Sequence, residues 1–381
     1  MSILHNAFVN ITSIDTLVYA HKKAMIGKRQ NNKATTSNYH FMSELLVLQD
    51  ELQKGTYRPA PYRNRIIREP KVRYIQAPDF RDRIVHHAIH SVLSPFYERH
   101  FIPDSYACRS GRGVHRATAR IQTFLRHSPV PLYVCKLDIS KYYASINHAR
   151  LKQLLAAKIN DPELLALLDV IIDSTNGGTE HNHLFAPDSY FHTKGPRGIP
   201  IGNLTSQLFA NIYLHHADMF AKQQLKIHHY IRYMDDILIF HEDKAQLRIW
   251  QQAMTNFFYE ELYLTVNPHK IRTYPARLGV DFVGYIIYPH SMRLRGSSVR
   301  RFKKRYRRQL RNLLTGKISQ EHLKASFKSW VAHASHADTK QLVRHLKNWG
   351  NNYLFAYAVQ KYARKKHLHG PQSQLSLFDK E

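Results

Sequence analysis

The sequence predicts an α+β fold, in which strands gather in the middle of the chain and helices flank them. Residues 1–55 and those after about 291 carry apolar side chains at helical spacing. Between them, the stretches 65–78, 131–139 and 228–240 are rich in β-branched and aromatic residues, which predicts strands. Two apolar runs within 228–240 flank one short turn, as in a β-hairpin.

The other elements follow in order along the chain. Gly55 ends the N-terminal helical extension, and a helix follows the strand pair at 65–78. The turn from Gly111 to Gly113 opens a basic helix. Periodicity and breaker residues predict four later segments: helices at 148–172, 204–224 and about 242–261, and strands near 271–289. A long polar loop precedes the helix at 204–224.

The charge of the chain indicates an anionic partner. Lys and Arg number 56 against 28 Asp and Glu, which gives a net charge of +28. Such a surface repels itself unless a polyanion is present, and nucleic acid is the leading candidate. We find no run of about 18 apolar residues and no signal-peptide pattern, so a membrane role is disfavoured and a cytoplasmic location in bacteria is expected.

Cysteine and histidine patterns do not indicate a zinc site. Cys108 and Cys135 lack CxxC spacing. The histidine pairs that begin at 86, 215 and 228 have no HExxH or Cys/His pattern, and we expect them to be mostly surface or nucleic-acid-facing residues. The tripeptide HNH at 181–183 lacks the context of a metal-binding nuclease motif.

Three aspartates are candidates for chemistry. Asp235 and Asp236 lie at the predicted hairpin tip in HHYIRYMDDILIF, where a solvated turn would be the simple alternative. Asp138 ends the apolar strand YVCKLDI. If the two strands are neighbours in one sheet, three carboxylates converge at one end of it. Such a cluster repels itself unless cations neutralise it.

Divalent cations are therefore predicted at the three aspartates. Two Mg²⁺ ions about 3.5 to 4 Å apart stabilise the attacking and leaving oxygens in phosphoryl transfer. Mg²⁺ suits carboxylate, water and phosphate ligands better than Zn²⁺ does, and Mn²⁺ could substitute for it. The chemistry implied is nucleotidyl transfer or hydrolysis on a polyanion.

The motifs around these acids resemble those of bacterial reverse transcriptases. In order, they are KLDISKYYASI, GIPIGNLTSQLFANIYL, RYMDDILIF, LTVNPHKIRTY and VDFVGYII, similar to motifs A to E of that family. The resemblance implies a right-hand polymerase with fingers, an antiparallel-sheet palm and a helical thumb. Four parts are expected: an N-terminal helical extension at 1–55, fingers and palm at 56–290, a basic thumb at 291–369 and a flexible tail at 370–381.

The resemblance assigns roles at the reaction centre. Asp138 and Asp235 would hold the metals, Asp236 would support the site, and the Ile139 carbonyl would complete the coordination. Tyr143 sits where the family excludes the ribose 2′-hydroxyl, which suits a DNA-making enzyme. A role for Tyr143 as an ordinary core residue stays open.

Basic residues are assigned to the incoming nucleotide and the leaving group. Lys71 and Arg73 match the fingers position that grips the triphosphate. Arg81 and Arg83 would assist them, or would pair with Asp79 and Asp82 instead. Lys270 matches the motif D lysine, which would give a proton to pyrophosphate; a solvated surface lysine is its alternative.

Motif B departs from many relatives. Where they read PQG, this chain has Pro200, Ile201 and Gly202. Isoleucine offers shape but no hydrogen bonds beside the new base pair, so discrimination between nucleotides should weaken. The phrase IGNLTSQ, with Ser206 and Gln207, resembles the enzymes of diversity-generating retroelements, so Gln207 joins the predicted nucleotide site.

That narrower resemblance implies an error-prone RNA-directed DNA polymerase and its partners. It would copy a structured template-repeat RNA with errors opposite adenine, beside a small basic accessory protein. Two alternatives stay open. One is another bacterial reverse transcriptase, from a degenerate group II intron, a CRISPR locus or a phage-defence system. The other is a non-catalytic RNA-binding scaffold, which the three acids argue against.

The segment RRFKKRYRRQLR, residues 300–311, predicts a nucleic-acid-binding helix. Its apolar residues form a stripe at helical spacing that should pack inward, namely Phe302, Tyr306, Leu310 and Leu313. Its basic residues should face the backbone of an RNA–DNA hybrid, namely Arg300, Arg301, Lys303, Lys304, Arg307 and Arg308.

The C-terminal residues contain a candidate docking peptide. QLSLF resembles the pentapeptide by which bacterial proteins bind the replication sliding clamp. The anchors would be Gln374, Leu375, Leu377 and Phe378 in an extended tail. A chance match, or a tail folded back on the thumb, is the alternative.

Overall fold

The computed structural model describes residues 3–27, 41–67, 73–175 and 195–365, and it divides into two compact units. The first unit comprises Met1–Ala117 and Tyr133–Tyr274, and the second comprises Thr118–Leu132 and Pro275–Glu381. None of the helices in the described residues is both long and apolar enough to cross a membrane. The secondary structure mixes helices and strands, as the sequence predicts.

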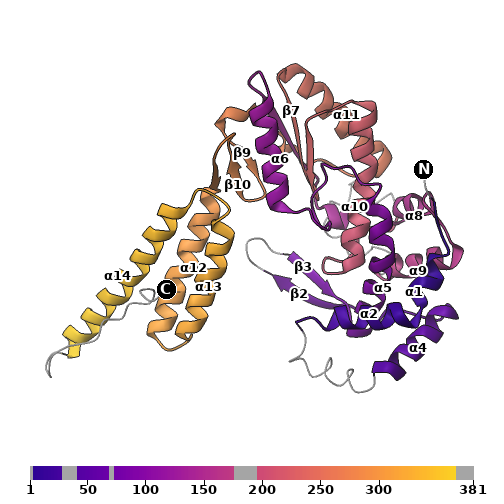
Figure 1. Cartoon of the computed structure of the whole chain (residues 1–381), viewed down its shortest axis with the longest axis horizontal. Helices are drawn as coiled ribbons and strands as arrows, with labels where there is room; N and C mark the ends of the chain where they lie inside the picture. The colour runs from indigo at the N-terminus through magenta and orange to yellow at the C-terminus, as the bar shows by residue number, and fades with distance from the viewer. Residues whose placement is uncertain (1–2, 28–40, 68–72, 176–194, 366–381) are drawn as a thin grey trace. The chain divides into compact units, whose positions relative to one another are not determined.

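Helices form one side of the first unit. They are α1 (Ala7–Thr12), α2 (Ile14–Met25), α4 (Phe41–Gln53) and α5 (Phe80–Glu98). Ser13 caps α2 by accepting a hydrogen bond from the Thr16 amide, and Asp79 caps α5 in the same way. Helix α2 packs along α5 (Figure 1). The predicted helical character of the first 55 residues is confirmed for the part that the structure describes.

The predicted strand pair at 65–78 is confirmed. Strands β2 (Arg63–Ile67) and β3 (Arg73–Ala77) are antiparallel, with Arg63 opposite Ala77 and Ile67 opposite Arg73. Every residue of β2 is exposed, whereas Gln76 of β3 is buried, so β2 is the solvent-facing strand of the hairpin.

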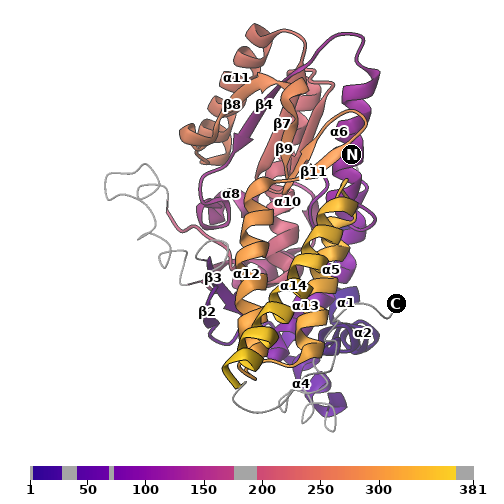
Figure 2. The same cartoon turned by 90° about the vertical axis from the view of Figure 1, so that its left-hand side faces the viewer.

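The central sheet carries the aspartates. Its strand order is β6 (Tyr230–Tyr233), β7 (Asp236–His241), β4 (Tyr133–Asp138) and β8 (Arg272–Pro275). Strand β7 is antiparallel to both β6 and β4, and helix α11 (Lys244–Leu262) packs on β4 and β7 (Figure 2). The predicted hairpin and its neighbouring strand are thus confirmed.

Further helices complete the core of the first unit. They are α8 (His148–Ala156), α9 (Pro162–Asp173) and α10 (Leu204–Met219). Most of α10 is buried, and a π-helical turn at Phe220–Gln224 continues it to the end of the predicted helix. Sequence reasoning missed the short parallel pairing of β1 (Leu4–His5) with β5 (Ile159–Asn160).

In the described residues, the second unit contains a small antiparallel sheet, three long helices and most of α6 (Val114–His127), the basic helix predicted after Gly113. The strands are β9 (Val280–Phe282), β10 (Tyr285–Ile287) and β11 (Met292–Leu294), and the helices are α12 (Gly296–Leu314), α13 (Gln320–Ala334) and α14 (Lys340–Lys365). Helix α12 packs on both α13 and α14 (Figure 1). The Phe302 ring stacks on Trp330 with centroids 4.0 Å apart.

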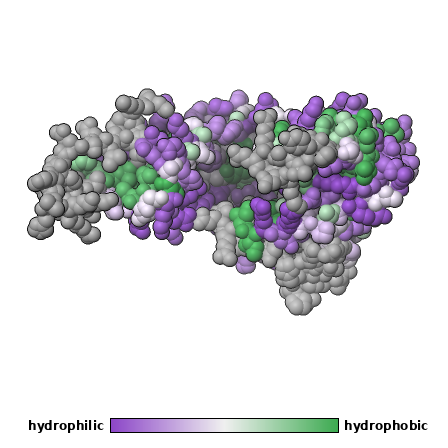
Figure 3. Space-filling model, turned by 90° about the horizontal axis from the view of Figure 1, so that it is seen from below, coloured by the Kyte–Doolittle hydropathy of each residue, from purple (hydrophilic) through white to green (hydrophobic). Residues whose placement is uncertain are grey.

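The predicted faces of α12 are confirmed. Phe302, Tyr306 and Leu310 are buried, and Leu313 is half-buried. The six predicted nucleic-acid-binding residues are all exposed: Arg300, Arg301, Lys303, Lys304, Arg307 and Arg308. Hydrophilic side chains also cover most of the described surface in Figure 3, with smaller hydrophobic areas between them. The helix therefore offers one strongly basic face.

Candidate active site

The three aspartates meet at one end of the central sheet. Asp138, the last residue of β4, lies directly opposite Asp236, the first residue of β7. Asp235 precedes Asp236 in the turn, and its carbonyl accepts a hydrogen bond from the Ile139 amide at 3.4 Å. Met234 begins the turn with a φ of 56°, a left-handed conformation that reverses the chain sharply. The convergence predicted from the strand pattern is therefore observed.

Lysines neutralise two of these carboxylates. The Lys270 ammonium forms an ion pair with Asp138, and Lys136 Nζ lies 3.3 Å from Asp236 Oδ1. Lys270 reaches Asp138 because its 3₁₀ turn, Pro268–Lys270, starts at Asn267, whose amide donates to the Asp138 carbonyl at 2.8 Å. Within the described residues, no three His, Cys, Asp or Glu side chains are arranged to hold a metal ion.

The chemistry of the carboxylates nevertheless fits a divalent cation. Burial and the negative charge of Asp236, with a smaller contribution from Asp138, raise the pKa of Asp235 to about 6. A cation at this point would relieve both the repulsion and the loss of hydration. Carboxylate oxygens are the ligands that Mg²⁺ prefers. Asp138, Asp235 and Asp236 are the residues that would hold it.

A buried ion pair fixes the turn from beneath. The Arg232 guanidinium donates to both carboxylate oxygens of Asp218 at 2.7 Å, and neither side chain is exposed to solvent. The same guanidinium donates to Asn211 Oδ1 at 3.1 Å and to the Met234 carbonyl at 3.3 Å. Tyr230 also donates to Asp218, at 2.8 Å. Arg232 thereby connects helix α10 to the residue before Asp235.

Sequence reasoning missed this network, although a signal was present. Arg232 stands in an apolar strand, and a guanidinium that becomes buried there needs an acid beside it. Asp218 is the acid in the next helix upstream, at a position buried in α10. Sequence reasoning also missed the pairing of Lys136 with Asp236, although Lys136 is likewise a charged residue within an apolar strand, β4.

Tyr143 and Ile139 lie beside the aspartate turn. The Tyr143 hydroxyl lies 3.7 Å from Met234 Sδ, and its ring packs on the hydrophobic core. Burial raises the pKa of this phenol, so it stays protonated. Ile139 is buried and pairs with Val266 as an isolated β-bridge. Both residues are thus close to Asp235, as the assignment of a nucleotide site requires.

The motif B loop is fixed to strand β3. The Gln76 amide donates to the Ile201 carbonyl at 3.0 Å. Gly202 has a φ of +133°, and a Cβ there would meet the Gln76 carbonyl at 3.0 Å, so only glycine fits without strain. Ile201 and Gln207 are half-buried, and Ser206 is buried in α10. The hairpin and the loop therefore share one backbone contact.

Several predicted residues lie outside what the structure describes. Lys71 falls in 68–72, the HNH tripeptide falls in 176–194, and the peptide with Gln374, Leu375, Leu377 and Phe378 falls in 366–381. For Arg73 the structure describes the backbone, which pairs with Ile67 in the hairpin. The roles assigned to these residues stay predictions.

The arginines of α5 do not pair as one alternative proposed. Arg81 forms an ion pair with Glu51, and Asp79 pairs with Arg63 at 3.0 Å. Asp82 is buried and accepts hydrogen bonds from the Tyr57 hydroxyl and the Ala60 amide. Arg83 donates to the Pro78 carbonyl at 3.4 Å. It forms no ion pair within the described part of the chain.

The expectation that the histidine pairs are surface residues is wrong for His86. Its side chain is 3% exposed and packs between α5 and α10, where His86 Nδ1 lies 2.9 Å from Thr205 Oγ1. Burial lowers the pKa of His86 to about 3, so the ring is neutral. The packing of two helices decides this burial, which the local sequence does not reveal.

Comparison with known proteins places this site in a family. Residues 64–287 match the family model described as reverse transcriptase (RNA-dependent DNA polymerase). The protein YkfC of Escherichia coli is 30% identical over 185 residues, which are 48% of this chain and 46% of YkfC. The group II intron-encoded protein LtrA of Lactococcus lactis is 29% identical over 175 residues, 45% of this chain and 27% of LtrA.

These matches span only part of the relatives. The chain covers less than half the length of YkfC and about a quarter of LtrA. Among solved structures, apo telomerase from Candida tropicalis is similar with a TM-score of 0.42 and 13% identity, over 68% of this chain and 53% of that one.

Proposed function

The chain belongs to the reverse transcriptase (RNA-dependent DNA polymerase) family, and from this membership we propose that it extends a DNA strand along an RNA template. One observation carries the proposal. Asp138 lies opposite Asp236 on adjacent strands, and Asp235 lies beside them in a turn that Arg232 fixes. Nucleoside triphosphates are the substrates that such a group of acids serves, through divalent cations.

The residues around the turn would have different roles in the reaction. Bound at Asp138, Asp235 and Asp236, Mg²⁺ would neutralise the negative charge that develops on the attacking and leaving oxygens. Lys270, which forms an ion pair with Asp138, would give a proton to the leaving pyrophosphate. Tyr143 beside Met234 would exclude a ribose 2′-hydroxyl, so that deoxynucleotides are selected.

Primer extension tests this proposal. The purified chain, an RNA template, a DNA primer, Mg²⁺ and dNTPs should give extension that Asp235→Ala lowers by about 10³-fold or more, because cations supply several kcal/mol to the transition state. Glu260→Ala, which removes an exposed acid of α11, should extend like the parent. Equal extension by Asp235→Ala and the parent would overturn the mechanism.

We further propose that the enzyme is error-prone and serves a diversity-generating retroelement. It would copy a template-repeat RNA into cDNA mutated opposite adenine. Ile201 supports this reading, because its apolar side chain stands where many relatives have a glutamine, and its carbonyl ties the loop to Gln76. A structured template RNA, a small basic accessory protein and a sliding clamp that binds QLSLF are the partners of this proposal.

The fidelity claim has its own test. Ile201→Gln should lower misincorporation opposite template adenine by about 10-fold, since a restored hydrogen-bonding group favours the correct pair. Ile201→Leu keeps the apolar character and should leave fidelity as it is. Sequencing of cDNA from both variants and the parent gives the error rates. Unchanged errors in Ile201→Gln would remove the motif B argument while leaving polymerase activity intact.

A further inference from the structure

A small cavity lies against the motif B loop, in the first unit. Its volume is about 360 Å³, and residues from α2, β3, α5 and the start of α10 line it. The lining residues that matter are Lys23, Arg83, His86, His87, Gly202 and Asn203. Of these polar side chains, only that of Arg83 has a role in the assignments above, where it would assist Lys71 and Arg73 at the triphosphate. A volume of this size lies at the small end of the range for ligand sites in proteins.

The electrostatics of the cavity favour an anion. Lys23 and Arg83 are cationic, and no described residue that lines the cavity is acidic. Helix α10 begins here at Leu204, and its N-cap, Asn203, makes no side-chain capping bond. The first amides of a helix lack partners within it and carry a partial positive charge. A phosphate is the anion that such a helix end, beside two cations, binds well.

Two buried polar atoms in the lining have no partner within the described residues. They are His86 Nε2 and Asn203 Oδ1. The other polar atoms of these side chains are engaged: Nδ1 of His86 with Thr205 Oγ1, and Nδ2 of Asn203 with the Tyr62 hydroxyl, both at 2.9 Å. Thr205 can donate to Nδ1, which leaves Nε2 of the neutral ring as a donor.

A buried donor and a buried acceptor are therefore unsatisfied among the residues that line one cavity. Leaving such atoms unpaired costs roughly 1 to 3 kcal/mol each, so the site gains when a ligand pairs with them. A hydroxyl group is the simplest partner for both, because it accepts one hydrogen bond and donates another.

We propose that this cavity binds one nucleotide of an RNA strand through its phosphate and its ribose 2′-hydroxyl. The phosphate lies against Lys23, Arg83 and the start of α10. The 2′-hydroxyl accepts from His86 Nε2 and donates to Asn203 Oδ1. This assignment rests on the proposed function, since it supplies a means of preferring an RNA template over DNA. The 2′-hydroxyl is the group by which proteins distinguish the two.

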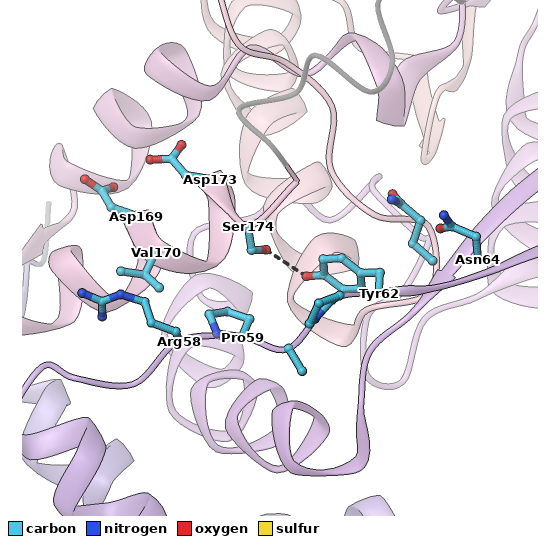
Figure 4. Close-up of a pocket in the computed structure, with 11 residues that line it drawn as sticks. Arg58, Pro59, Tyr62, Asn64, Asp169, Val170, Asp173 and Ser174 are labelled. Carbon is cyan, nitrogen blue, oxygen red and sulfur yellow. Dashed lines mark hydrogen bonds between the residues drawn. The ribbon is translucent and has the colours of Figure 1, made fainter.

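A second cavity nearby is a poorer candidate for binding a phosphate. That cavity, about 580 Å³, is lined by Asp169, Asp173, Arg58 and Tyr62 among others (Figure 4). Its two acids lie on α9 and repel phosphate, and Arg58 already donates to the carbonyls of its own loop. Tyr62 bonds to Ser174 at 3.0 Å and accepts from Asn203, so it joins the two cavities.

Binding measurements on the full chain test the proposal without any need for catalysis. The probes are a fluorescent DNA primer on an RNA template, the same primer on a DNA template, and RNA templates with a single 2′-deoxynucleotide moved along the strand. His86→Phe keeps a buried ring and removes the donor. It should weaken RNA binding by about 3- to 10-fold, leave DNA binding as it is, and abolish sensitivity to one 2′-deoxy position.

Matched variants separate the two contacts. Arg83→Gln should weaken RNA and DNA binding equally and flatten the dependence of affinity on salt, because it removes a phosphate contact. Asp169→Asn, in the neighbouring cavity, should leave the RNA preference unchanged. Thermal unfolding identifies any variant that fails to fold. If His86→Phe fails, Asn203→Asp replaces it. A carboxylate at 203 still accepts the hydroxyl proton but repels phosphate, so binding of both the RNA and the DNA template should weaken.

The outcomes keep the two proposals apart. Equal losses on RNA and DNA in His86→Phe, or a parent with no position sensitive to 2′-deoxy substitution, would overturn the cavity assignment. If the parent shows the 2′-hydroxyl preference yet extends no primer, the polymerase proposal fails and the cavity assignment stands.

Discussion

Two ion pairs in the first unit differ in almost every physical respect. Arg232 and Asp218 are fully buried, and five hydrogen bonds from Arg232 and Tyr230 hold the pair and its surroundings in one arrangement. Lys270 and Asp138 form a single contact, and 43% of the Lys270 side chain is exposed. The two pairs lie on either side of the same turn, which contains Met234 and Asp235.

The difference in burial indicates that the two ion pairs have different roles. A buried pair in which every guanidinium nitrogen is hydrogen-bonded is costly to break, because removal of either partner leaves an uncompensated charge in a low dielectric. A half-exposed lysine on a short 3₁₀ turn can leave its carboxylate at little cost, since exposed pairs contribute about 0 to 1 kcal/mol. The first pair therefore positions the turn, while the second can yield to a cation or a substrate.

The largest expected effect comes from breaking the buried pair. Arg232→Met should lower the free energy of unfolding by about 3 to 5 kcal/mol, because Asp218 is left charged and unpaired. Urea unfolding followed by circular dichroism gives the value. Lys270→Met, its counterpart at the exposed pair, should change stability by less than about 1 kcal/mol.

A double variant sharpens this result. Arg232→Met with Asp218→Leu removes both charges and should recover most of the lost stability, since well-packed apolar residues can replace a buried pair. Primer extension should stay low, because the Met234 carbonyl has lost its donor. Full activity in the double variant would show that Arg232 does not position the turn.

The second effect concerns the exposed pair and appears in the rate. Lys270→Ala should lower kcat by about 10²-fold, at the lower end of what a positioned proton donor contributes. Single-turnover extension at saturating dNTP measures it. Lys244→Ala, an exposed lysine at the start of α11, is the control and should leave kcat as it is. A loss confined to KM would assign Lys270 to substrate binding.

The smallest effect is a pH dependence without divalent cations. The pKa of Asp235 is raised to about 6 in the folded protein and is near 4 in an unfolded chain. The folded state binds more protons between these values, so its stability falls as pH rises from about 4 to about 6, by roughly 1 to 3 kcal/mol. Asp235→Asn has no carboxyl group to titrate at this position and should be the more stable protein at about pH 7.

Buried histidines act in the opposite direction. The pKa of His86 is lowered to about 3, so the unfolded state takes up the proton first, and stability is lost as pH falls below about 6.5. The informative quantity is therefore the difference between Asp235→Asn and the parent, from urea unfolding in EDTA. Adding Mg²⁺ at about pH 7 should stabilise the parent and leave Asp235→Asn less affected.

The sequence sufficed for the elements whose pattern is local. Alternating apolar residues and turn residues predicted the β2–β3 and β6–β7 hairpins, and a strand that ends in Asp138 predicted the meeting of three acids. The apolar stripe of α12 was found in the same way, because helical spacing alone determines which residues face inward.

What the sequence did not reveal depends on packing between distant segments. The pattern of histidine pairs predicts a surface position for His86, whereas in the structure it is buried and contacts Thr205 of α10. The partnership of Arg232 with Asp218, and that of Lys270 with Asp138, joins residues that no periodicity relates. Charged side chains in buried strands were the one available sign, since each requires a counter-charge.

The loop at 201–203 also has a consequence for how this protein can vary. At 202 the backbone conformation and the nearby Gln76 carbonyl favour glycine alone, whereas residue 201 is half-buried and bonds to Gln76 through its backbone carbonyl, which any side chain would leave in place. In a saturation library, position 202 should therefore tolerate almost nothing and position 201 many residues. If residue 201 sets copying accuracy as proposed, that accuracy can change over generations at one residue while Gly202 preserves the loop.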